Sequence, residues 1–225
     1  LYINLIMYKS KINLIYIFKK IIFRYNTFKE HPLVKNPSYG IIKYLYINFI
    51  LRYIVKQKIV KWVNGLKYYL SLGDSSMIGI YYFTFPDYPE FIFLLSYLNK
   101  KDVFIDIGSN QGLYTLFVSG IIGSKTISIE PIQNTYKRLL LNLKLNNLKN
   151  VEPLNIGLSN QIGIKNMSNN KGELNKILID DNNDSEIVKV SILDQIYQNR
   201  KNISVLKIDV EGYEKFILEG GIKTL

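Results

Sequence analysis

The segment DIGSNQG, from Asp106 to Gly112, has the residue types of a ligand-binding turn between an apolar run and a helical pattern. Gly108 and Gly112 allow positive φ angles and a close approach of the backbone to a ligand. No Gly-Lys-Ser/Thr follows, which excludes a phosphate-binding P-loop, and the G-x-G-x-x-G spacing for a pyrophosphate is also missing. Because the carboxylate of Asp106 would repel an anion, the turn favours a cationic or zwitterionic ligand, and S-adenosylmethionine fits. The structural alternative is that Asp106 only holds the loop together.

A second acidic residue, Glu130, follows the apolar run TISI and lies 18 residues after Gly112. An acid at this distance from a glycine turn accepts hydrogen bonds from both ribose hydroxyls of a bound nucleoside. NAD-dependent enzymes use the same feature, so Glu130 indicates a nucleoside without saying which one. An exposed acid at a strand end before Pro131 is the structural alternative.

The segment LKIDVEGYE supplies candidate groups for proton transfer. Asp209 and Glu211 are two residues apart, so in an extended segment their side chains point to the same side. Methyl transfer to a hydroxyl benefits from a base near the acceptor, and we expect Asp209, Glu211 or Tyr213 to be that base. Alternatively, Glu211 or Glu214 only favours the positive end of the following helix.

Composition excludes several kinds of site. The 225 residues, 48% of them hydrophobic, suffice for one domain, or for one domain with a smaller attachment. The absence of cysteine excludes disulfides, thiolate metal sites and cysteine nucleophiles, and it suits a reducing, cytoplasmic compartment. The one histidine, His31, is far from the glycine turn, so we expect it to be structural or solvated and expect no metal site.

The elements that must position these residues alternate between strands and helices. Apolar runs predict strands at 103–107, 126–131 and 150–158, and the segment 204–212 supplies another strand. Helical patterns predict three helices. The first follows the glycine turn, the second ends at Asn146-Asn147, and the third runs from about 213 to Gly220-Gly221. This order predicts an α/β fold with a mostly parallel sheet. Residues 160–190 interrupt the alternation and predict an extended loop or a hairpin insertion.

The first 70 residues are strongly basic, with 13 Lys and Arg against one acid, whereas the remainder holds 16 basic and 17 acidic residues. An apolar stripe from Leu14 to Tyr25 predicts a helix, and we expect either contact with anionic lipid or packing on its own domain. Charged residues interrupt every apolar run, so no membrane span is expected. No recognised nucleic-acid module accompanies the charge, so no nucleic-acid partner is expected.

The sequence between this helix and the glycine turn is less regular. Pro32, Pro37 and Gly40 indicate a linker over 26–40, followed by a second basic helix over about 41–63. Tyrosine-rich runs predict strands and turns over 65–85, and EFIFLLSYLN predicts a short helix over 90–99.

Three ordered blocks carry a resemblance to a known family. They are DVFIDIGSNQGLYTL, SIEPIQNTYKRLLLNLKLNNLKNVEPLNIGLSNQIG and VSILDQI…VLKIDVEGYEKFILEGGIKTL, which together span about 100–225. This combination resembles the FkbM family of S-adenosylmethionine-dependent methyltransferases, and residues 73–98 resemble the segment that precedes the family's catalytic domain. The resemblance implies a Rossmann-like class I methyltransferase fold. It also implies methyl transfer to a hydroxyl of a sugar, another small molecule or a glycan.

The resemblance also implies roles for individual residues. The methionine part of the cofactor would contact the glycine turn. Glu130 would bind the ribose, and Asn155 would lie near the adenine. Asp209 and Glu211 would face the methyl group and the acceptor. Ser109 stands where the family often has alanine, a change that the turn should tolerate. The turn residues implied in cofactor binding are Asp106, Gly108, Ser109, Asn110 and Gly112.

We therefore expect a basic helical extension over 1–70, lead-in strands and a helix over 71–100, and a methyltransferase domain over 101–225. Family members continue past the helix that ends at Gly220-Gly221 with further strands, so we expect the domain to be C-terminally incomplete. The alternative function is a truncated, catalytically silent α/β module that binds a nucleoside or a partner. An NAD-dependent oxidoreductase is disfavoured by the spacing of the glycine turn.

Overall fold

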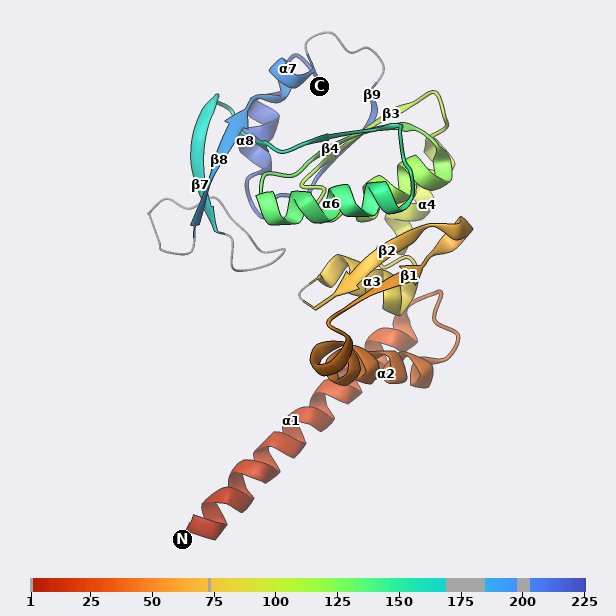
Figure 1. Ribbon diagram of the computed structural model, residues 1–225, viewed down its shortest axis with the longest axis vertical. Helices are drawn as coiled ribbons and strands as arrows, with labels where there is room; N and C mark the ends of the chain where they lie inside the picture. The colour runs from red at the N-terminus through yellow and green to blue at the C-terminus, as the bar shows by residue number, and fades with distance from the viewer. Residues whose placement is uncertain (1, 73, 169–184, 198–202) are drawn as a thin grey trace.

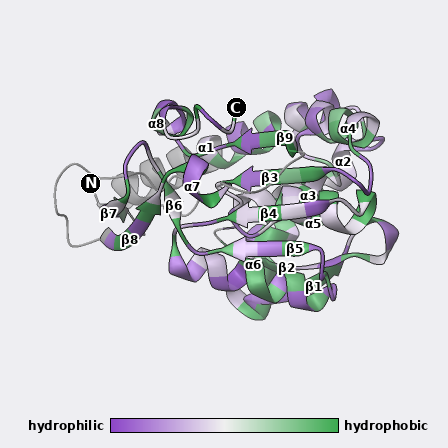
Figure 2. Ribbon diagram, turned by 90° about the horizontal axis from the view of Figure 1, so that it is seen from above, coloured by the Kyte–Doolittle hydropathy of each residue, from purple (hydrophilic) through white to green (hydrophobic). Residues whose placement is uncertain are grey.

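A four-stranded parallel sheet forms the centre of the computed structural model, which describes residues 2–72, 74–168, 185–197 and 203–225, with side chains from residue 16. The strands stand in the order β5-β4-β3-β9, and Figure 2 shows them side by side. They are β3 (Val103–Ile107), β4 (Lys125–Ile129), β5 (Val151–Leu154) and β9 (Ile203–Ile208). This arrangement confirms the predicted α/β fold with a parallel sheet.

Both faces of this sheet are covered, as the nearly continuous apolar strands require. Phe104 faces one core, which it shares with α4 (Tyr88–Tyr97), α5 (Leu113–Phe117), the π-helix η3 (Val118–Ile122) and α6 (Gln133–Leu145). Its neighbour Ile105 faces the other core, which contains α7 (Leu193–Ile196) and Ile217 of α8 (Glu214–Glu219). The predicted helices after the glycine turn, before Asn146-Asn147 and after residue 213 are confirmed.

A smaller three-stranded sheet lies beside the main one (Figure 1). Its strands are β6 (Gly157–Leu158), β7 (Gly163–Ser168) and β8 (Ser185–Ser191), in the order β6-β8-β7. The antiparallel pairing of β7 with β8 confirms the hairpin alternative for the described part of 160–190, and the stretch 169–184 lies outside the described residues.

The N-terminal part is more helical than the sequence predicts. Figure 1 shows α1 projecting from the body of the molecule, with the N-terminus at its far end. The order of elements is α1 (Tyr2–Glu30), α2 (Pro37–Leu45), the π-helix η1 (Tyr46–Val55), β1 (Gln57–Lys61), the 3-10 helix η2 (Val63–Gly65), β2 (Lys67–Ser71) and α3 (Ser75–Phe83). Among the described residues, no helix is both long enough and apolar enough to cross a membrane.

Three predictions for this part were wrong. The expected linker over 26–40 is mostly helical, because Asn36 caps α2 by accepting a hydrogen bond from the Tyr39 amide, and Pro37 suits a first helical turn. The expected helix over 41–63 ends near Lys56, whose φ of 60° breaks it, and a strand follows. Residues 75–83 form a helix instead of strands, since burying Met77 and Ile80 on one side outweighs the β-preference of the tyrosines.

The N-terminal part shares its core with the sheet. Trp62 packs against Phe91 and Phe117, and its Nε1 donates to the Thr84 carbonyl at 2.8 Å. The backbone of β2 lies along α6, where buried Asn142 accepts a hydrogen bond from the Tyr69 amide at 2.9 Å. One apolar core therefore runs across the predicted boundaries at 70 and 100, and the division into three segments stays a prediction.

Candidate functional site

A cavity of about 170 Å³ lies at the carboxyl ends of the parallel strands. The turns after β3, β4 and β9 line it, and Ser76 and Asp87 contribute from the N-terminal part. The strand order changes direction at β3, with β4 and β5 on one side and β9 on the other. Ligands of open α/β sheets bind at such a reversal, so this cavity is the candidate site.

The glycine turn adopts the backbone that its sequence predicts. The φ angles of Gly108, Asn110 and Gly112 are 72°, 50° and 94°. The amides of Gly108 and Ser109 both donate to the Ile129 carbonyl, at 2.9 and 3.0 Å, which fixes the turn to the end of β4. Ser109 lines the cavity, and its buried Oγ has no hydrogen-bond partner among the described residues. A buried hydroxyl of this kind is costly unless a ligand or water satisfies it.

Asp106 is fully buried behind the turn and does not line the cavity. Its Oδ2 accepts a hydrogen bond from Thr115 Oγ1 at 2.7 Å. Its Oδ1 lies 3.3 Å from Lys207 Nζ, an ion pair without hydrogen-bond geometry. These contacts match the alternative in which Asp106 holds the loop together, and any effect on a ligand would act through charge.

Two further predicted binding residues also lie outside the cavity lining. A Cβ at Gly112 would come within 2.6 Å of Leu139, so this glycine allows α6 to pack closely against the turn. Asn155 donates from Nδ2 to the carbonyls of Glu130 and Pro131, at 2.8 and 2.9 Å. Asn155 therefore ties the end of β5 to the segment after β4 and supports the position of Glu130.

Glu130 lines the cavity, and its side chain is almost completely buried. Oε2 accepts from the Asn110 amide at 3.0 Å, and Oε1 accepts from the Ile132 amide at 2.9 Å. Burial raises the pKa of Glu130 to about 7, although these two amide hydrogen bonds favour its charged form. Each oxygen keeps a free lone pair, so an ionised Glu130 can accept hydrogen bonds from a diol.

Asp209 and Glu211 both line the cavity, but not for the predicted reason. Strand β9 ends at Ile208, and Glu211 has a φ of 53°, so the segment is a turn and is not extended. The turn brings both carboxylates to the rim, where Asp209 is 68% exposed. Tyr213 lies instead on a neighbouring cavity of about 30 Å³, with its hydroxyl 3.4 Å from Ser159 Oγ.

Sequence reasoning missed several polar residues of the cavity, among them Lys207, Tyr114 and Asp87. Lys207 Nζ lies 3.5 Å from Asp209 Oδ2 and 4.9 Å from the centre of the Tyr114 ring. The Tyr114 hydroxyl donates to Asp87 Oδ2 at 2.7 Å. Burial raises the pKa of Tyr114 most, and this hydrogen bond raises it further. A charged residue inside the apolar run SVLKI is a signal that could have identified Lys207. Asp87 and Tyr114 carried no comparable signal, because only the fold brings them together.

His31 takes the structural role that its position suggested. Its Nε2 lies 2.9 Å from the Phe85 carbonyl, and its ring stacks on Phe83 with centroids 4.6 Å apart. Within the described residues, no group of three His, Cys, Asp or Glu side chains is arranged to hold a metal ion.

The fold and the site define a class of protein. A parallel sheet, a glycine turn after its central strand, an acid after the next strand and a shared cavity are typical of α/β domains that bind a cofactor containing a nucleoside. Residues 106–225, slightly more than half of the chain, match the family described as the methyltransferase FkbM domain. The chain belongs to this family, which confirms the resemblance, and S-adenosylmethionine is the cofactor of its methyltransferase domain.

Several solved structures are similar over part of their length. The TYW2 protein of M. jannaschii, in complex with AdoMet, is 23% identical over 44% of this chain and 42% of its own, with a TM-score of 0.33. The P. horikoshii TYW2, in complex with MeSAdo, is 19% identical over 47% of this chain and 39% of its own, with a TM-score of 0.36. An rRNA methylase from Streptococcus thermophilus is 19% identical over 31% of this chain and 41% of its own, with a TM-score of 0.29. The chain spans about two fifths of the length of these structures, and no curated protein matches it.

Proposed function

We propose that this chain transfers a methyl group from S-adenosylmethionine to a hydroxyl of a sugar, another small molecule or a glycan. The observation that carries the proposal is a single cavity that joins Ser109, Asn110 and Glu130 on one side to Asp209 and Glu211 on the other. A binding side for a nucleoside therefore faces carboxylates that can accept a proton.

The residues present fit the cofactor. The unpartnered Ser109 Oγ can hydrogen-bond a ligand that enters the cavity, and Glu130 can accept the ribose hydroxyls. The lining also carries the carboxylates of Asp87, Asp209 and Glu211, which favours a ligand with positive charge. Gly108, Asn110 and Gly112 shape the turn, with Gly112 acting through the packing of α6.

The acceptor side supplies a base. When bound, S-adenosylmethionine supplies a methyl group whose bond to a positively charged sulfur breaks, with the electron pair left on sulfur, as the new oxygen–carbon bond forms. Asp209 or Glu211 takes the proton that the acceptor hydroxyl loses. The two carboxylates lie at the open rim, where a large acceptor such as a glycan can reach them.

Isothermal titration calorimetry of the whole chain with S-adenosylmethionine, S-adenosylhomocysteine and NAD tests the nucleoside site. We expect the first two to bind and Glu130→Ala to weaken both by at least about tenfold, or 1.4 kcal/mol. Glu30→Ala, an exposed acid at the end of α1 and outside the cavity lining, is the control and should leave both affinities unchanged. Binding of NAD alone would overturn the proposal. Cofactor binding without transfer of labelled methyl to any sugar or glycan would support the silent-module alternative.

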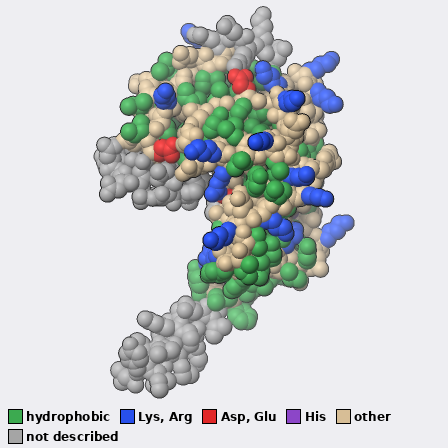
Figure 3. Space-filling view, viewed as in Figure 1, with side chains coloured by type: hydrophobic (Ala, Val, Ile, Leu, Met, Phe, Trp, Pro, Cys, Tyr) green, Lys and Arg blue, Asp and Glu red, His purple; other side chains and the backbone are tan. Residues whose placement is uncertain are grey.

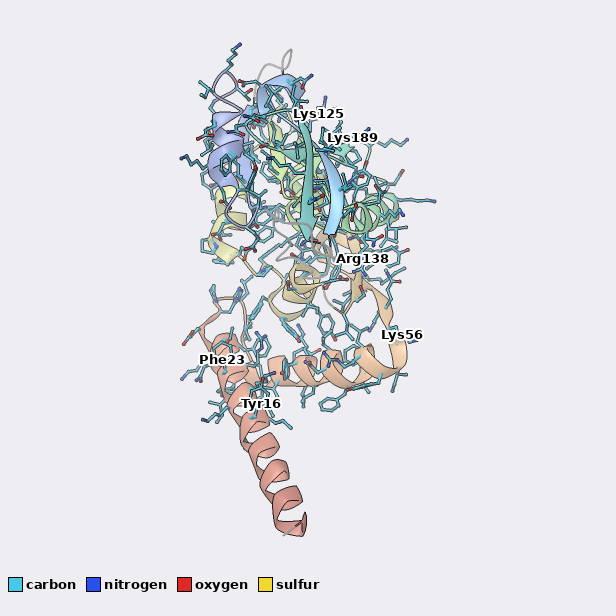
Figure 4. All side chains as sticks on the ribbon, turned by 90° about the vertical axis from the view of Figure 1, so that its left-hand side faces the viewer. Tyr16, Phe23, Lys56, Lys125, Arg138 and Lys189 are labelled. Carbon is cyan, nitrogen blue, oxygen red and sulfur yellow. The ribbon has the colours of Figure 1, made fainter. Side chains whose placement is uncertain are left out.

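We further propose that the N-terminal part holds this cytoplasmic enzyme at an anionic membrane surface. The exposed side of α2 and η1 is apolar, and Figure 3 shows a hydrophobic region there with lysines and arginines around it. Figure 4 shows Tyr16 and Phe23 projecting from α1 and Lys56 at the far end of η1. Exposed aromatic and aliphatic side chains beside basic residues suit the boundary between lipid headgroups and acyl chains, and vesicle cosedimentation can test this contact.

A further inference from the structure

Lys207 has an unusual position for a charged side chain. It is the penultimate residue of β9, is 18% exposed, and is the one cation among the described residues that line the cavity. Its Nζ lies 3.3 Å from Asp106 Oδ1 and 3.5 Å from Asp209 Oδ2. One ammonium therefore joins the buried acid behind the glycine turn to the acid at the acceptor rim.

The surroundings hold this ammonium in place from several elements. Tyr114 of α5 presents its ring face at 4.9 Å, and Asp87, which precedes α4, fixes the Tyr114 hydroxyl. The charged and titratable groups around Lys207 are thus Asp106, Asp209, Tyr114 and, through Tyr114, Asp87, while Glu130 and Glu211 share the cavity lining with it. Moving the ammonium away would leave the buried charge of Asp106 uncompensated, which is strongly unfavourable.

We propose that Lys207 is a positioning residue that sets the charge of the methyl-donor cavity and thereby the preference between S-adenosylmethionine and S-adenosylhomocysteine. This inference rests on the proposed function. The cofactor carries a positive sulfur and the spent product does not, so a fixed positive charge in the cavity disfavours the cofactor more than the product. Because that positive charge disappears during methyl transfer, Lys207 disfavours the ground state more than the transition state.

Calorimetry with both ligands on Lys207→Met tests the inference. Removing the ammonium makes the cavity more negative, so we expect the ratio of the S-adenosylhomocysteine Kd to the S-adenosylmethionine Kd to rise about threefold to tenfold. Lys207→Arg keeps the charge and should leave this ratio within about twofold of the wild-type value. Lys215→Met is the control, because Lys215 is 81% exposed and pairs only with Glu219 on α8 among the described residues, so the ratio should not change.

A second pair of variants separates charge from packing and serves if Lys207→Met does not fold. Asp106→Asn removes the opposite charge and should lower the same ratio, whereas the double variant Asp106→Asn/Lys207→Met should return it toward the wild-type value. A ratio that stays constant across these variants overturns the inference, and so does an equal loss of affinity for both ligands. A wild-type chain that binds neither ligand would instead overturn the proposed function, which keeps the two failures distinguishable.

Discussion

Glu130 shows how one residue can be tuned by its surroundings. A carboxylate with so little exposure loses most of its hydration, and this loss disfavours its charged form. The amides of Asn110 and Ile132 recover only part of that free energy, so the pKa of Glu130 rises to about 7. The proposed ribose acceptor is therefore half protonated near neutral pH in the ligand-free protein.

The pKa of Glu130 predicts the pH dependence of cofactor binding. Above pH 7 the carboxylate is ionised and can accept two hydroxyls, whereas below pH 7 the added proton removes an acceptor site. We expect the S-adenosylmethionine affinity, measured by calorimetry, to fall about tenfold between pH 8 and pH 6. Glu130→Gln should bind more weakly and show a flat profile over this range, and a flat wild-type profile would contradict the assignment.

The raised pKa of Glu130 affects folding stability in the opposite direction from cofactor binding. The folded state binds the Glu130 proton more tightly than the unfolded state, whose carboxyl has the ordinary value of 4.5. This group therefore favours folding below about pH 4.5, and its contribution is lost as the pH rises to about 7. Ligand binding thus favours the ionised form of this carboxyl, whereas folding favours its protonated form. Such a conflict is common where a protein holds a functional group in a destabilising environment.

At the scale of elements, the turns after β3 and β9 are built to fit each other. A Cβ at Gly108 would stand 2.0 Å from the Asp209 carbonyl oxygen, so only glycine lets the two turns meet. On the other side, Glu211 and Gly212 have φ angles of 53° and 92°. A non-glycine residue in the left-handed region is uncommon, and here it lets the β9 turn bring Glu211 to the cavity.

Gly108→Ala should therefore damage both the fold and the site. The clash with the Asp209 backbone and the φ of 72° should lower the free energy of unfolding by about 2–4 kcal/mol, measured by urea denaturation. Gly163→Ala is the matched control, because a Cβ there meets nothing within 4 Å, and it should change the stability by less than about 0.5 kcal/mol. Equal effects of the two substitutions would show that the turns do not depend on this contact.

At the scale of the whole molecule, the basic N-terminal part and the sheet form one packed unit. The core that contains Phe28 and Leu51 also contains Phe104 and Leu139, so the N-terminal helices cannot separate from the sheet without exposing apolar surface. The opposite side of the same helices leaves Tyr53 and Ile54 71% exposed. The cavity is therefore held at a fixed position relative to the apolar and basic surface.

This surface should bind vesicles in a charge-dependent and apolar-dependent manner. We expect the chain to cosediment with vesicles that contain anionic lipid, less with purely zwitterionic ones, and less as the salt rises from about 50 to 500 mM. Tyr53→Ser/Ile54→Ser should reduce the bound fraction several-fold. Ile164→Ser/Ile187→Ser, two isoleucines of the β7–β8 hairpin that are each 70% exposed, is the matched control and should not. Binding that ignores salt, or that falls equally with both pairs, would contradict the membrane proposal.

The main sheet was predictable because its signals are local and agree with one another. The runs at 103–107 and 126–131 are apolar, begin or end at turn residues, and alternate with helical patterns, so they are confirmed almost to the residue. The region from 37 to 83 was less predictable, since short aromatic segments suit a helix or a strand equally. Packing against Phe28 and Trp62 decided between them, and such packing is a property of the assembled fold.

The sequence by itself determined the family, the parallel α/β order and the candidate turns around Gly108, Glu130 and Asp209. These depend on residue types and spacings within short segments, which the chain carries before it folds. Only the tertiary structure decided that Asp106, Gly112 and Asn155 lie outside the cavity lining, and that Lys207, Tyr114 and Asp87 lie within it. Asp87, Asn155 and Lys207 are far in the chain from the segment 106–114 that holds the other three, and their shared surroundings exist only once the sheet and helices have packed.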